Sequence, residues 1–226
     1  MNHRLLQCQI LLHYQNLLTV QYFLSLQTDI QILAPCKDRG DASVFNLNLD
    51  VQEYVNPHSP DKNEIKVNVS KDKYYYLREG DKVMCIKNNY KICGQNKKGV
   101  FNGWCGILKE IDTWSGFHKV YIPMTDDTMI FSTSDLTNGV VLGYASTVHK
   151  YQGSSAKVII GAFDNTTPPD MRTKELIYTL WTRAEKDCVT VAQNSALYNA
   201  ALNSGISDKN TFLVELLDET LNSEVA

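Results

Sequence analysis

One internal segment has a sequence pattern unlike its surroundings, and this contrast constrains the fold more than any other feature. Between residues 74 and 137, short runs of β-forming residues alternate with turns that contain glycine. Short strands separated in this way are typical of a small antiparallel barrel. The predicted strands are Tyr74–Tyr76, Lys82–Ile86, Gly106–Ile111, Lys119–Ile122 and Thr128–Phe131.

The flanking segments follow an α/β pattern instead. Asp29–Pro35 has the composition of a short buried strand that stops at a proline, and a predicted helix follows at Asp41–Tyr54. Lys157–Phe163 and Cys188–Ala192 are apolar runs typical of fully buried parallel strands, with a predicted helix at Thr173–Ala184 between them. The sequence therefore predicts an α/β domain with a parallel sheet, interrupted by a small all-β insertion.

The remaining segments are assigned from composition and periodicity. Over the first 26 residues, leucine, glutamine and tyrosine recur at helical spacing, which indicates a partly buried helix. Residues 57–73 are polar and contain two prolines, so they are predicted to form a loop. Two further helices are predicted at Ser195–Asn203 and Asn210–Leu221.

Composition excludes several classes of protein. Of the 226 residues, 43% are hydrophobic and 21% are charged, which excludes wholesale disorder. No apolar run reaches the roughly eighteen residues of a membrane span, and the stretch 5–26 lacks a signal-peptide cleavage site. We therefore expect a cytoplasmic protein without membrane contact. The six cysteines form no CxxC pair, so we expect reduced thiols and no metal; a site among Cys85, Cys93 and Cys105 is the weaker alternative.

The net charge of −3 hides a segregation of charge along the chain. The segment Lys82–Lys109 contains six lysines and no acidic residue, whereas residues 208–226 carry five acids and one lysine. A local groove for nucleic acid is compatible with this pattern. The plainer alternative is a solvated, lysine-rich hairpin.

The segment Tyr144–Ser155 has the residues of a phosphate-binding loop. It is polar and rich in hydroxyls, contains a lysine and a glycine, and lies just before a predicted buried strand. Hydroxyls, backbone N–H groups and a lysine are suited to holding phosphate. The alternative is the start of a helix capped by Ser146 or Thr147.

Two other segments place cations at the ends of predicted elements. Glu175–Lys186 puts Arg183 between an apolar helix and a strand, and a planar guanidinium is suited to a transferring phosphoryl group. Ile32–Gly40 presents Lys37 and Arg39 after a strand, where ligands bind in α/β sheets. The alternatives are an arginine at a solvated helix end and a basic surface loop.

Taken in chain order, with the β-rich segment after the first of them, these motifs resemble the C-terminal motor region of RecD-like superfamily 1 DNA helicases. ILAPCKDRG (32–40) is similar to helicase motif IV, YASTVHKYQGS (144–154) to motif V and YTLWTRAEK (178–186) to motif VI. The resemblance extends over about residues 28–220. Its other parts are Leu47-Asn48, Val51-Gln52 and Asn56-Pro57 after motif IV, GDKVMCIKNNY (80–90) and VFNGWCGIL (100–108) in an SH3-like insertion, and the closing segments from Ala196 to Leu217.

The resemblance implies a fold with two parts. Residues 1–73 and 138–226 would form a discontinuous RecA-like motor domain, the second of the two motor domains in such helicases. Residues 74–137 would form an SH3-like β-barrel inserted into it.

The resemblance also implies roles for particular residues. Arg183 would be the arginine finger that reaches the γ-phosphate of ATP, and Arg39, or alternatively Lys37, would contact the same phosphate. Gln152, Gly153 and Tyr178 would lie at the nucleotide cleft. Single-stranded DNA would be contacted by Thr147, His149 and Lys150 of motif V, and by Lys87, Asn88, Asn89, Tyr90 and Asn102 of the insertion. A basic groove with an aromatic platform is suited to such a strand.

The sequence departs from the family pattern at several positions. Ser155 stands where the family usually has an acidic residue, and Trp181 and Glu185 replace smaller or basic residues. The motif IV loop is one residue longer, which leaves the choice between Lys37 and Arg39 open.

The P-loop pattern GxxxxGK[ST] does not occur in the 226 residues. We therefore expect half of an ATP site: a fragment or split-gene product without ATPase activity by itself. ATP and Mg²⁺ would be held mostly by an N-terminal P-loop motor domain. Expected partners are that domain, single-stranded DNA and other recombination or repair subunits. The alternative is a non-enzymatic module that binds nucleic acid or protein.

Overall fold

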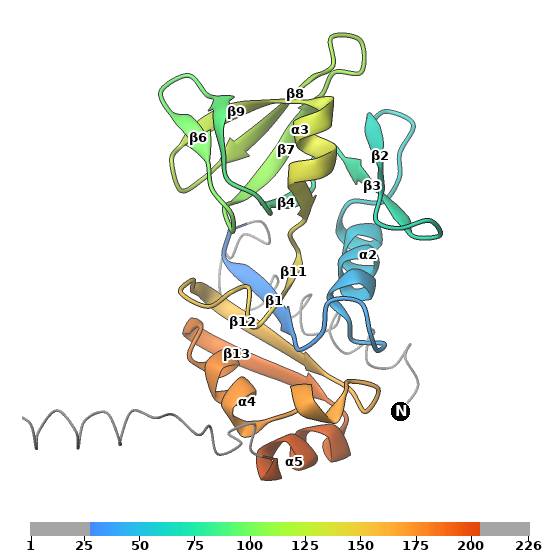
Figure 1. The fold of residues 1–226 in the computed structure, drawn as a ribbon, viewed down its shortest axis with the longest axis vertical. Coiled ribbons are helices and arrows are strands. Elements are labelled where there is room, and N and C mark those ends of the chain that lie inside the picture. The colour runs from blue at the N-terminus through green and yellow to red at the C-terminus, as the bar shows by residue number, and fades with distance from the viewer. Residues whose placement is uncertain (1–27, 204–226) are drawn as a thin grey trace, which may run out of the picture.

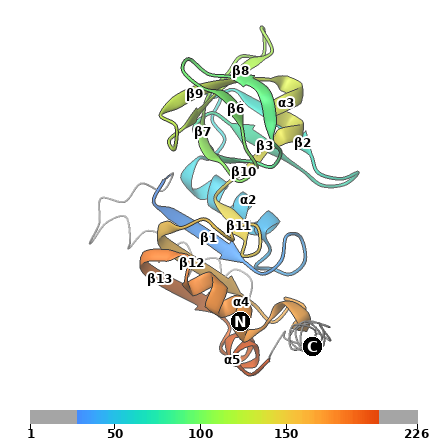
Figure 2. The same cartoon turned by 60° about the vertical axis from the view of Figure 1, so that its left-hand side comes forward.

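The computed structural model describes residues 28–203. The helices predicted over the first 26 residues and at Asn210–Leu221, and the closing segment after Asn203, lie outside the described residues. Within them the chain forms two bodies, a mixed α/β body and a β-barrel, with helix α2 (Val44–Val55) running between the two (Figures 1 and 2).

The α/β body is built on four parallel strands in the order β11-β1-β12-β13. The central strand β1 is fully buried, and Ile32 pairs with Ala145 on one side and Ile160 on the other. The parallel sheet and the strands predicted at Asp29–Pro35 and Lys157–Phe163 are confirmed. The strands are β1 (Ile30–Ala34), β11 (Ala145–Thr147), β12 (Ala156–Phe163) and β13 (Ala184–Ala192).

Strand β13 corrects one prediction, because it is not fully buried. Within the described residues it pairs only with β12 and forms the edge of the sheet, and residues 185–188 are exposed. Its apolar pattern reflects one covered face rather than two. Helix α4 (Lys174–Trp181) packs there through Leu180, which contacts Gly161 of β12, and α5 (Asn194–Leu202) follows (Figure 1).

The second body is a seven-stranded antiparallel sheet in the order β10-β4-β7-β8-β9-β5-β6. All five predicted β runs are strands, but the first, Tyr74–Tyr76, lies in β3 (Tyr74–Arg78) of a separate two-stranded sheet and not in the barrel sheet. Strands β5 and β6 are additional, and helix α3 (Thr133–Gly139) precedes β10. Strand β10 pairs with β4, so the predicted domain boundary after residue 137 falls before the last strand of this body. The strands are β4 (Lys82–Cys85), β5 (Asn89–Cys93), β6 (Lys98–Val100), β7 (Cys105–Ile111), β8 (Phe117–Ile122), β9 (Asp127–Ser132) and β10 (Val140–Leu142).

A two-stranded hairpin lies beside α2 and corrects the predicted loop at 57–73. Strand β2 (Glu64–Asn68) pairs with β3 (Tyr74–Arg78), so that Ile65 lies opposite Leu77 and Val67 opposite Tyr75. The two apolar residues of β2 alternate with charged and polar ones, which suits a strand with one covered face. The high charge of the segment concealed this period in the sequence.

Helix α2 joins the two bodies through a polar stripe. Ser43 caps its first turn by accepting a hydrogen bond from the N–H of Asn46, and Leu47 and Val51 face the core. Asn48, Gln52 and Asn56 follow at intervals of four residues, so they lie along one side of the helix and its end. This spacing is the structural reason for the pairs Leu47-Asn48, Val51-Gln52 and Asn56-Pro57 noted in the sequence.

The two ends of this stripe bind different bodies. The side chain of Asn48 accepts from the N–H of Ala145 at 2.9 Å and donates to its carbonyl at 3.0 Å, which satisfies the free edge of β11. Gln52 and Asn56 donate to Asp81, at the start of the barrel, over 2.6 and 2.7 Å. One helix face therefore fixes the barrel relative to the sheet.

Asp81 is the centre of this junction and has no exposed surface. Besides the two amides, it accepts from the N–H of Arg78 at 2.7 Å and from the Tyr144 hydroxyl at 3.0 Å. Each carboxylate oxygen thus accepts two hydrogen bonds, which uses its full capacity. Burial raises the pKa of Asp81, and the four donated hydrogen bonds oppose that rise.

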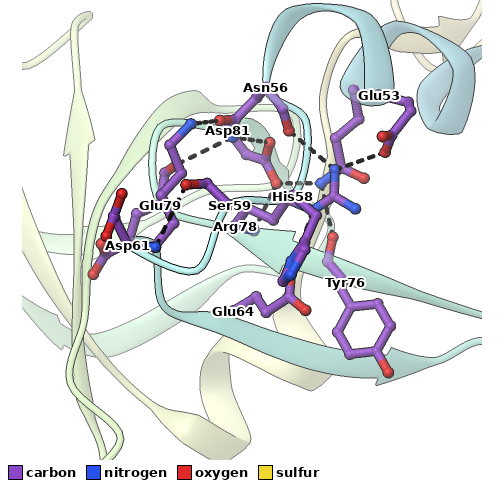
Figure 3. Close-up of polar contacts among 12 residues, drawn as sticks. Glu53, Asn56, His58, Ser59, Asp61, Glu64, Tyr76, Arg78, Glu79 and Asp81 are labelled. Carbon is purple, nitrogen blue, oxygen red and sulfur yellow. Dashed lines mark hydrogen bonds and ion pairs between the residues drawn. The ribbon is translucent and has the colours of Figure 1, made fainter.

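The surrounding polar contacts reinforce the junction (Figure 3). The Arg78 guanidinium donates to Glu53 and to the carbonyl of Asn56, both at 3.0 Å, and to Glu64 at 3.3 Å. These contacts tie strand β3 to the last turn of α2 and to strand β2.

Lys82 corrects the prediction that the whole lysine-rich segment is basic surface. Its side chain is buried and donates to the carbonyl of Ile30 in β1 at 2.8 Å. Burial lowers the pKa of Lys82. This hydrogen bond links the barrel to the parallel sheet, and the buried ammonium group of Lys82 is unavailable to a ligand.

We predict that Asp81→Asn destabilises the protein by about 2–4 kcal/mol, because the new amide turns N–H donors toward groups that themselves donate. Urea unfolding followed by circular dichroism measures the change. Asp126→Asn is the matched control: Asp126 is exposed, and its positive φ of 50° suits asparagine. Equal losses in the two variants would contradict the role of Asp81.

Candidate functional site

The motif IV loop lies at the carboxyl end of β1. The carbonyls of Cys36 and Lys37 accept from the N–H groups of Val44 and Phe45 at 2.9 Å, which fastens the loop to the start of α2. Gly40 has a φ of +91°, and a Cβ there would lie 2.7 Å from Thr166 Oγ1. The loop therefore requires glycine at this position, and its cationic side chains are held at one end of the sheet.

The end of β12 provides the other half of this contact. Asp164 Oδ2 accepts from the N–H of Ala42 at 2.6 Å, and Thr166 Oγ1 accepts from the N–H of Asp41 at 2.9 Å. Because β1 and β12 are parallel, both loops lie at the carboxyl edge of the sheet. The exposed side chains of Lys37 and Arg39 accordingly lie at this edge.

Motif V forms a compact turn after β11. Thr147 Oγ1 accepts from the N–H of Lys150 at 3.2 Å, and its carbonyl accepts from the N–H of Tyr151 at 3.1 Å. The buried Tyr151 donates its hydroxyl to the carbonyl of Ser155 at 2.9 Å. Thr147 is half-buried, while His149 and Lys150 are exposed.

Lys37 and Lys150, one from each loop, line the same hollow at the carboxyl edge of the sheet. Partial burial lowers the pKa of Lys150, and the positive charge of Lys37 lowers it further. Neither ammonium group has an ion-pair partner within residues 28–203. Two adjacent cations without a carboxylate are suited to an anionic ligand such as phosphate.

Arg183 lies at the opposite edge of the sheet. It follows the C-cap Thr182 of α4 and precedes β13, and its carbonyl accepts from the N–H of Ala156 at the start of β12. Its guanidinium donates to the carbonyl of Thr179 at 3.2 Å and to that of Ser154 at 3.5 Å. Half-buried and without a carboxylate partner in the described part of the chain, it is held in place by backbone carbonyls.

The motif V turn ends beside Arg183. Gln152 and Gly153 directly precede Ser154, and both are exposed. Gly153 has a φ of +83°, and nothing lies within 4 Å of where its Cβ would be. Tyr178, in helix α4 just before Arg183, is 68% exposed. Glycine here serves the left-handed turn and leaves open space around the backbone.

The sheet therefore separates the two arginines that the family resemblance assigns to one phosphate. Arg39 lies at the carboxyl edge of the sheet and Arg183 at the amino edge, so the length of the eight-residue strand β12 separates them. Eight residues in a strand extend about 25 Å. Lys37 and Arg39 lie with the end of β11 instead, near Thr147 and Lys150.

On the barrel, the structure joins several predicted residues and adds two that sequence reasoning missed. The N–H of Asn102 donates to Asn88 Oδ1 at 2.8 Å, which brings the two turns together. The Tyr90 ring lies 5.7 Å from that of Phe101, which lies 4.9 Å from Trp104. The aromatic residues at position 90 and on both sides of Gly103 were the available signal.

Two rings of this aromatic cluster are exposed and therefore accessible to a ligand. Tyr90 is 64% exposed and Phe101 is 37% exposed, with the exposed Lys87 close by in sequence. Asn89 is different, because its amide donates to Asp135 at 2.9 Å and its side chain is already engaged within the barrel. Stacking on such aromatic faces is a sequence-independent way to hold single strands.

The described residues contain neither a metal-binding cluster nor a membrane-spanning helix. No group of three or more His, Cys, Asp or Glu side chains is placed to hold a metal ion in residues 28–203. In the same range, no helix has the length and apolar character required to span a membrane.

Two family models match the chain. Residues 47–122 match the SH3 domain of ATP-dependent RecD-like DNA helicases, and residues 142–191 match the UvrD-like helicase C-terminal domain. The first match begins within α2, ahead of the insertion boundary predicted at residue 74. It thereby includes the helix that carries the polar stripe.

Two curated relatives align with most of the chain. An uncharacterized protein of Methanocaldococcus jannaschii is 28% identical over 193 residues, and the ATP-dependent RecD2 DNA helicase of Deinococcus radiodurans is 27% identical over 186 residues. These alignments cover 79% and 82% of this chain. They cover only 16% and 23% of the relatives, so the chain spans a minor part of their length.

Solved structures of Pif1 helicases share the fold. A Bacteroides Pif1 in complex with ADP-AlF3 and ssDNA aligns with a TM-score of 0.53 at 16% identity, covering 92% of this chain and 49% of the other. A Bacteroides Pif1 bound to ssDNA aligns with a TM-score of 0.51 at 16% identity, covering 92% and 50%. At this identity the likeness concerns the fold alone.

We predict that Gly40→Ala costs at least about 1 kcal/mol more stability than Gly153→Ala. Both residues have positive φ, which costs about 1–2 kcal/mol for alanine, but only at Gly40 does the new methyl meet another side chain. Chemical unfolding of the two variants measures the difference. Equal losses would contradict the close packing between the motif IV loop and Thr166.

Proposed function

We propose that this chain, whose residues 47–122 and 142–191 match helicase family models, is the SH3 and C-terminal motor part of a RecD-like superfamily 1 DNA helicase and supplies half of an ATP-driven motor. Its partner is a motor domain that carries the P-loop, in the same or another polypeptide. The proposal assigns ATP to one edge of the parallel sheet and single-stranded DNA to the other.

The observation that carries this proposal is the separation of cations on the two edges of the sheet. Arg183 lies with Gln152 and Gly153 at the amino edge, whereas Lys37 and Lys150 lie together at the carboxyl edge. A single polyphosphate site that uses all of these residues is incompatible with this geometry. Two phosphate ligands on opposite edges are compatible with it.

The amino edge has groups suited to the phosphates of a nucleotide. Arg183 offers a fixed, ionised guanidinium, and the exposed Gln152 and the open backbone at Gly153 offer neutral hydrogen-bonding groups. In this role Arg183 stabilises charge on the transferring phosphoryl group. Two acidic side chains at this edge already have partners: Glu185 accepts a hydrogen bond from Ser155, and Asp29 pairs with Lys157. The described residues offer no cluster of acidic side chains for Mg²⁺, so the partner domain supplies the metal ligands.

The carboxyl edge is suited to the backbone of a single strand. Lys37 and Lys150 provide adjacent charges, and Thr147 lies at the base of the same turn. We assign Arg39 to this edge as well, rather than to the γ-phosphate. The aromatic cluster and Lys87 of the barrel extend the strand contacts to the second body.

The motif V turn provides a physical route between the two sites. It begins at Thr147 on the carboxyl edge and ends at Ser154, whose carbonyl accepts from Arg183. A change of position at the nucleotide edge can therefore move Lys150 through one short hydrogen-bonded segment. In the complete motor, this would couple closure on ATP to a step along the strand.

We predict that the isolated chain has no ATPase activity and that a P-loop motor domain of the same family restores DNA-stimulated hydrolysis when mixed with it. Arg183→Ala in the mixture should lower the rate by about a thousandfold, the usual contribution of an arginine finger. Arg39→Ala is the matched control and should leave hydrolysis nearly unchanged at saturating DNA. Hydrolysis by the chain alone, or equal losses in both variants, would contradict the assignment.

We also predict that the chain binds single-stranded DNA with an affinity that falls steeply with salt. Lys37→Ala and Lys150→Ala should each reduce the slope of log affinity against log salt by about one, because each removes one phosphate contact. Fluorescence anisotropy of a labelled oligonucleotide measures both quantities. Lys119→Ala is the control, since that lysine pairs with Glu110 on the barrel. An unchanged slope in the Lys37 and Lys150 variants would contradict these contacts and favour the alternative that the chain is a protein-binding module.

A further inference from the structure

A cavity of about 460 Å³ lies where the two bodies meet. It is enclosed by α2, the β2–β3 hairpin, the end of α3 and the segment that runs from β10 to β11. Its walls are mainly apolar. They include Val44, Phe45 and Leu49 of α2, Val67 of β2 and Val140 of β10. This volume is within the range of about 300–1,000 Å³ that is usual for small-ligand sites.

The charged groups of the cavity are all cationic. Lys37 and Lys150 line it, and none of its lining residues is acidic. A third cation lies nearby, because the Lys73 ammonium is 5.3 Å from the centre of the Phe45 ring. The cavity therefore combines an apolar interior with exposed lysines, which suits a ligand with an anionic and an apolar part.

Two hydroxyl groups in the cavity walls lack partners. Tyr75 and Ser146 both line the cavity and are only 7% and 2% exposed. Neither hydroxyl oxygen has a hydrogen-bond partner in the described part of the chain. Buried hydroxyls without partners are uncommon in folded proteins and call for an explanation. Both oxygens have almost no accessible surface, so they lie behind the cavity wall and not at its face, and the Tyr75 hydroxyl is near Asp81.

We propose that this cavity takes one unstacked base of a bound single strand, with its flanking phosphate held by Lys37 and Lys150. This inference rests on the proposed binding of single-stranded DNA and adds a specific seat for a base. The apolar walls cover the faces of the base, and Thr137 and Asn138 are polar residues of the same lining.

The chemistry of the cavity favours a nucleotide over other ligands. A nucleotide has about twenty heavy atoms, which is within the size of ligands that such cavities hold. Its phosphate matches the two lysines that have no carboxylate partner. The seat is also separate from the aromatic cluster of the barrel, since Tyr90, Phe101 and Trp104 do not line the cavity. The two sites can therefore be tested independently.

The test compares two oligonucleotides of about twelve nucleotides, a length that one or two small domains cover. One is oligothymidine, and the other has the same backbone with abasic sites throughout. Binding is measured by fluorescence anisotropy on the full 226-residue chain carrying Tyr90→Ala and Phe101→Ala, so that stacking on the exposed aromatic cluster of the barrel does not contribute. We expect oligothymidine to bind about tenfold more tightly, a usual gain for one base held against an apolar surface.

Two variants that fill the cavity test whether the tighter binding of oligothymidine arises there. Leu49→Trp, and separately Val69→Trp at an exposed position of the cavity wall, should remove the advantage of oligothymidine and leave abasic binding unchanged. Met124→Trp is the matched control, because Met124 is exposed and does not line the cavity. Thermal unfolding verifies that each variant is folded, and the exposed position of Val69 guards against misfolding of the Leu49 variant.

The outcomes distinguish a failure of the base seat from a failure of the proposed strand binding. Equal affinity for both oligonucleotides, or an advantage that survives both cavity-filling variants, overturns the base seat while leaving strand binding intact. If neither oligonucleotide binds, the proposed function itself fails. Loss of the advantage in both filled variants, with abasic binding preserved, supports the seat.

Discussion

The buried carboxylate of Asp81 holds the two bodies of this protein together. The chain passes between the sheet and the barrel twice, after α2 and again between β10 and β11, and groups from both passages donate to Asp81. Because all four acceptor positions are used, the arrangement tolerates little displacement of either passage. Lys82 adds a second fixed point on β1. The cavity and the lysines at its mouth exist in their present geometry because this junction orients the barrel.

Much of the fold was predictable because the deciding signals are local. The apolar runs that form β1 and β12 and the turn glycines of the barrel lie in single short segments. Strand β2 was missed because its two apolar residues lie among charged ones. Strand β13 was taken as fully buried because an apolar run does not reveal how many neighbours a strand has. Lys82 was counted as surface because burial depends on a contact with β1, far away in sequence.

The candidate site was predictable only within each motif. Thr147 and Lys150 lie close in sequence, and a hydrogen bond joins them within one turn. The relation between motifs depends on strand direction, which places Arg39 and Arg183 on opposite edges of one sheet. Phe101 and Trp104 joined Tyr90 only when the barrel closed. The separation of these cationic residues onto two edges is therefore a result of the topology, and the motif V turn is the segment that connects the edges.

Photochemical crosslinking tests this division most directly. An oligonucleotide substituted with 5-iodouracil, irradiated with the protein and mapped by mass spectrometry, marks the residues that touch the strand. The two-edge arrangement predicts crosslinks in peptides that contain Phe45, Tyr75, Tyr90 or Phe101, and none at Tyr178 or Trp181 beside Arg183. Crosslinks concentrated at Tyr178 and Trp181, with none on α2 or the barrel, would contradict it.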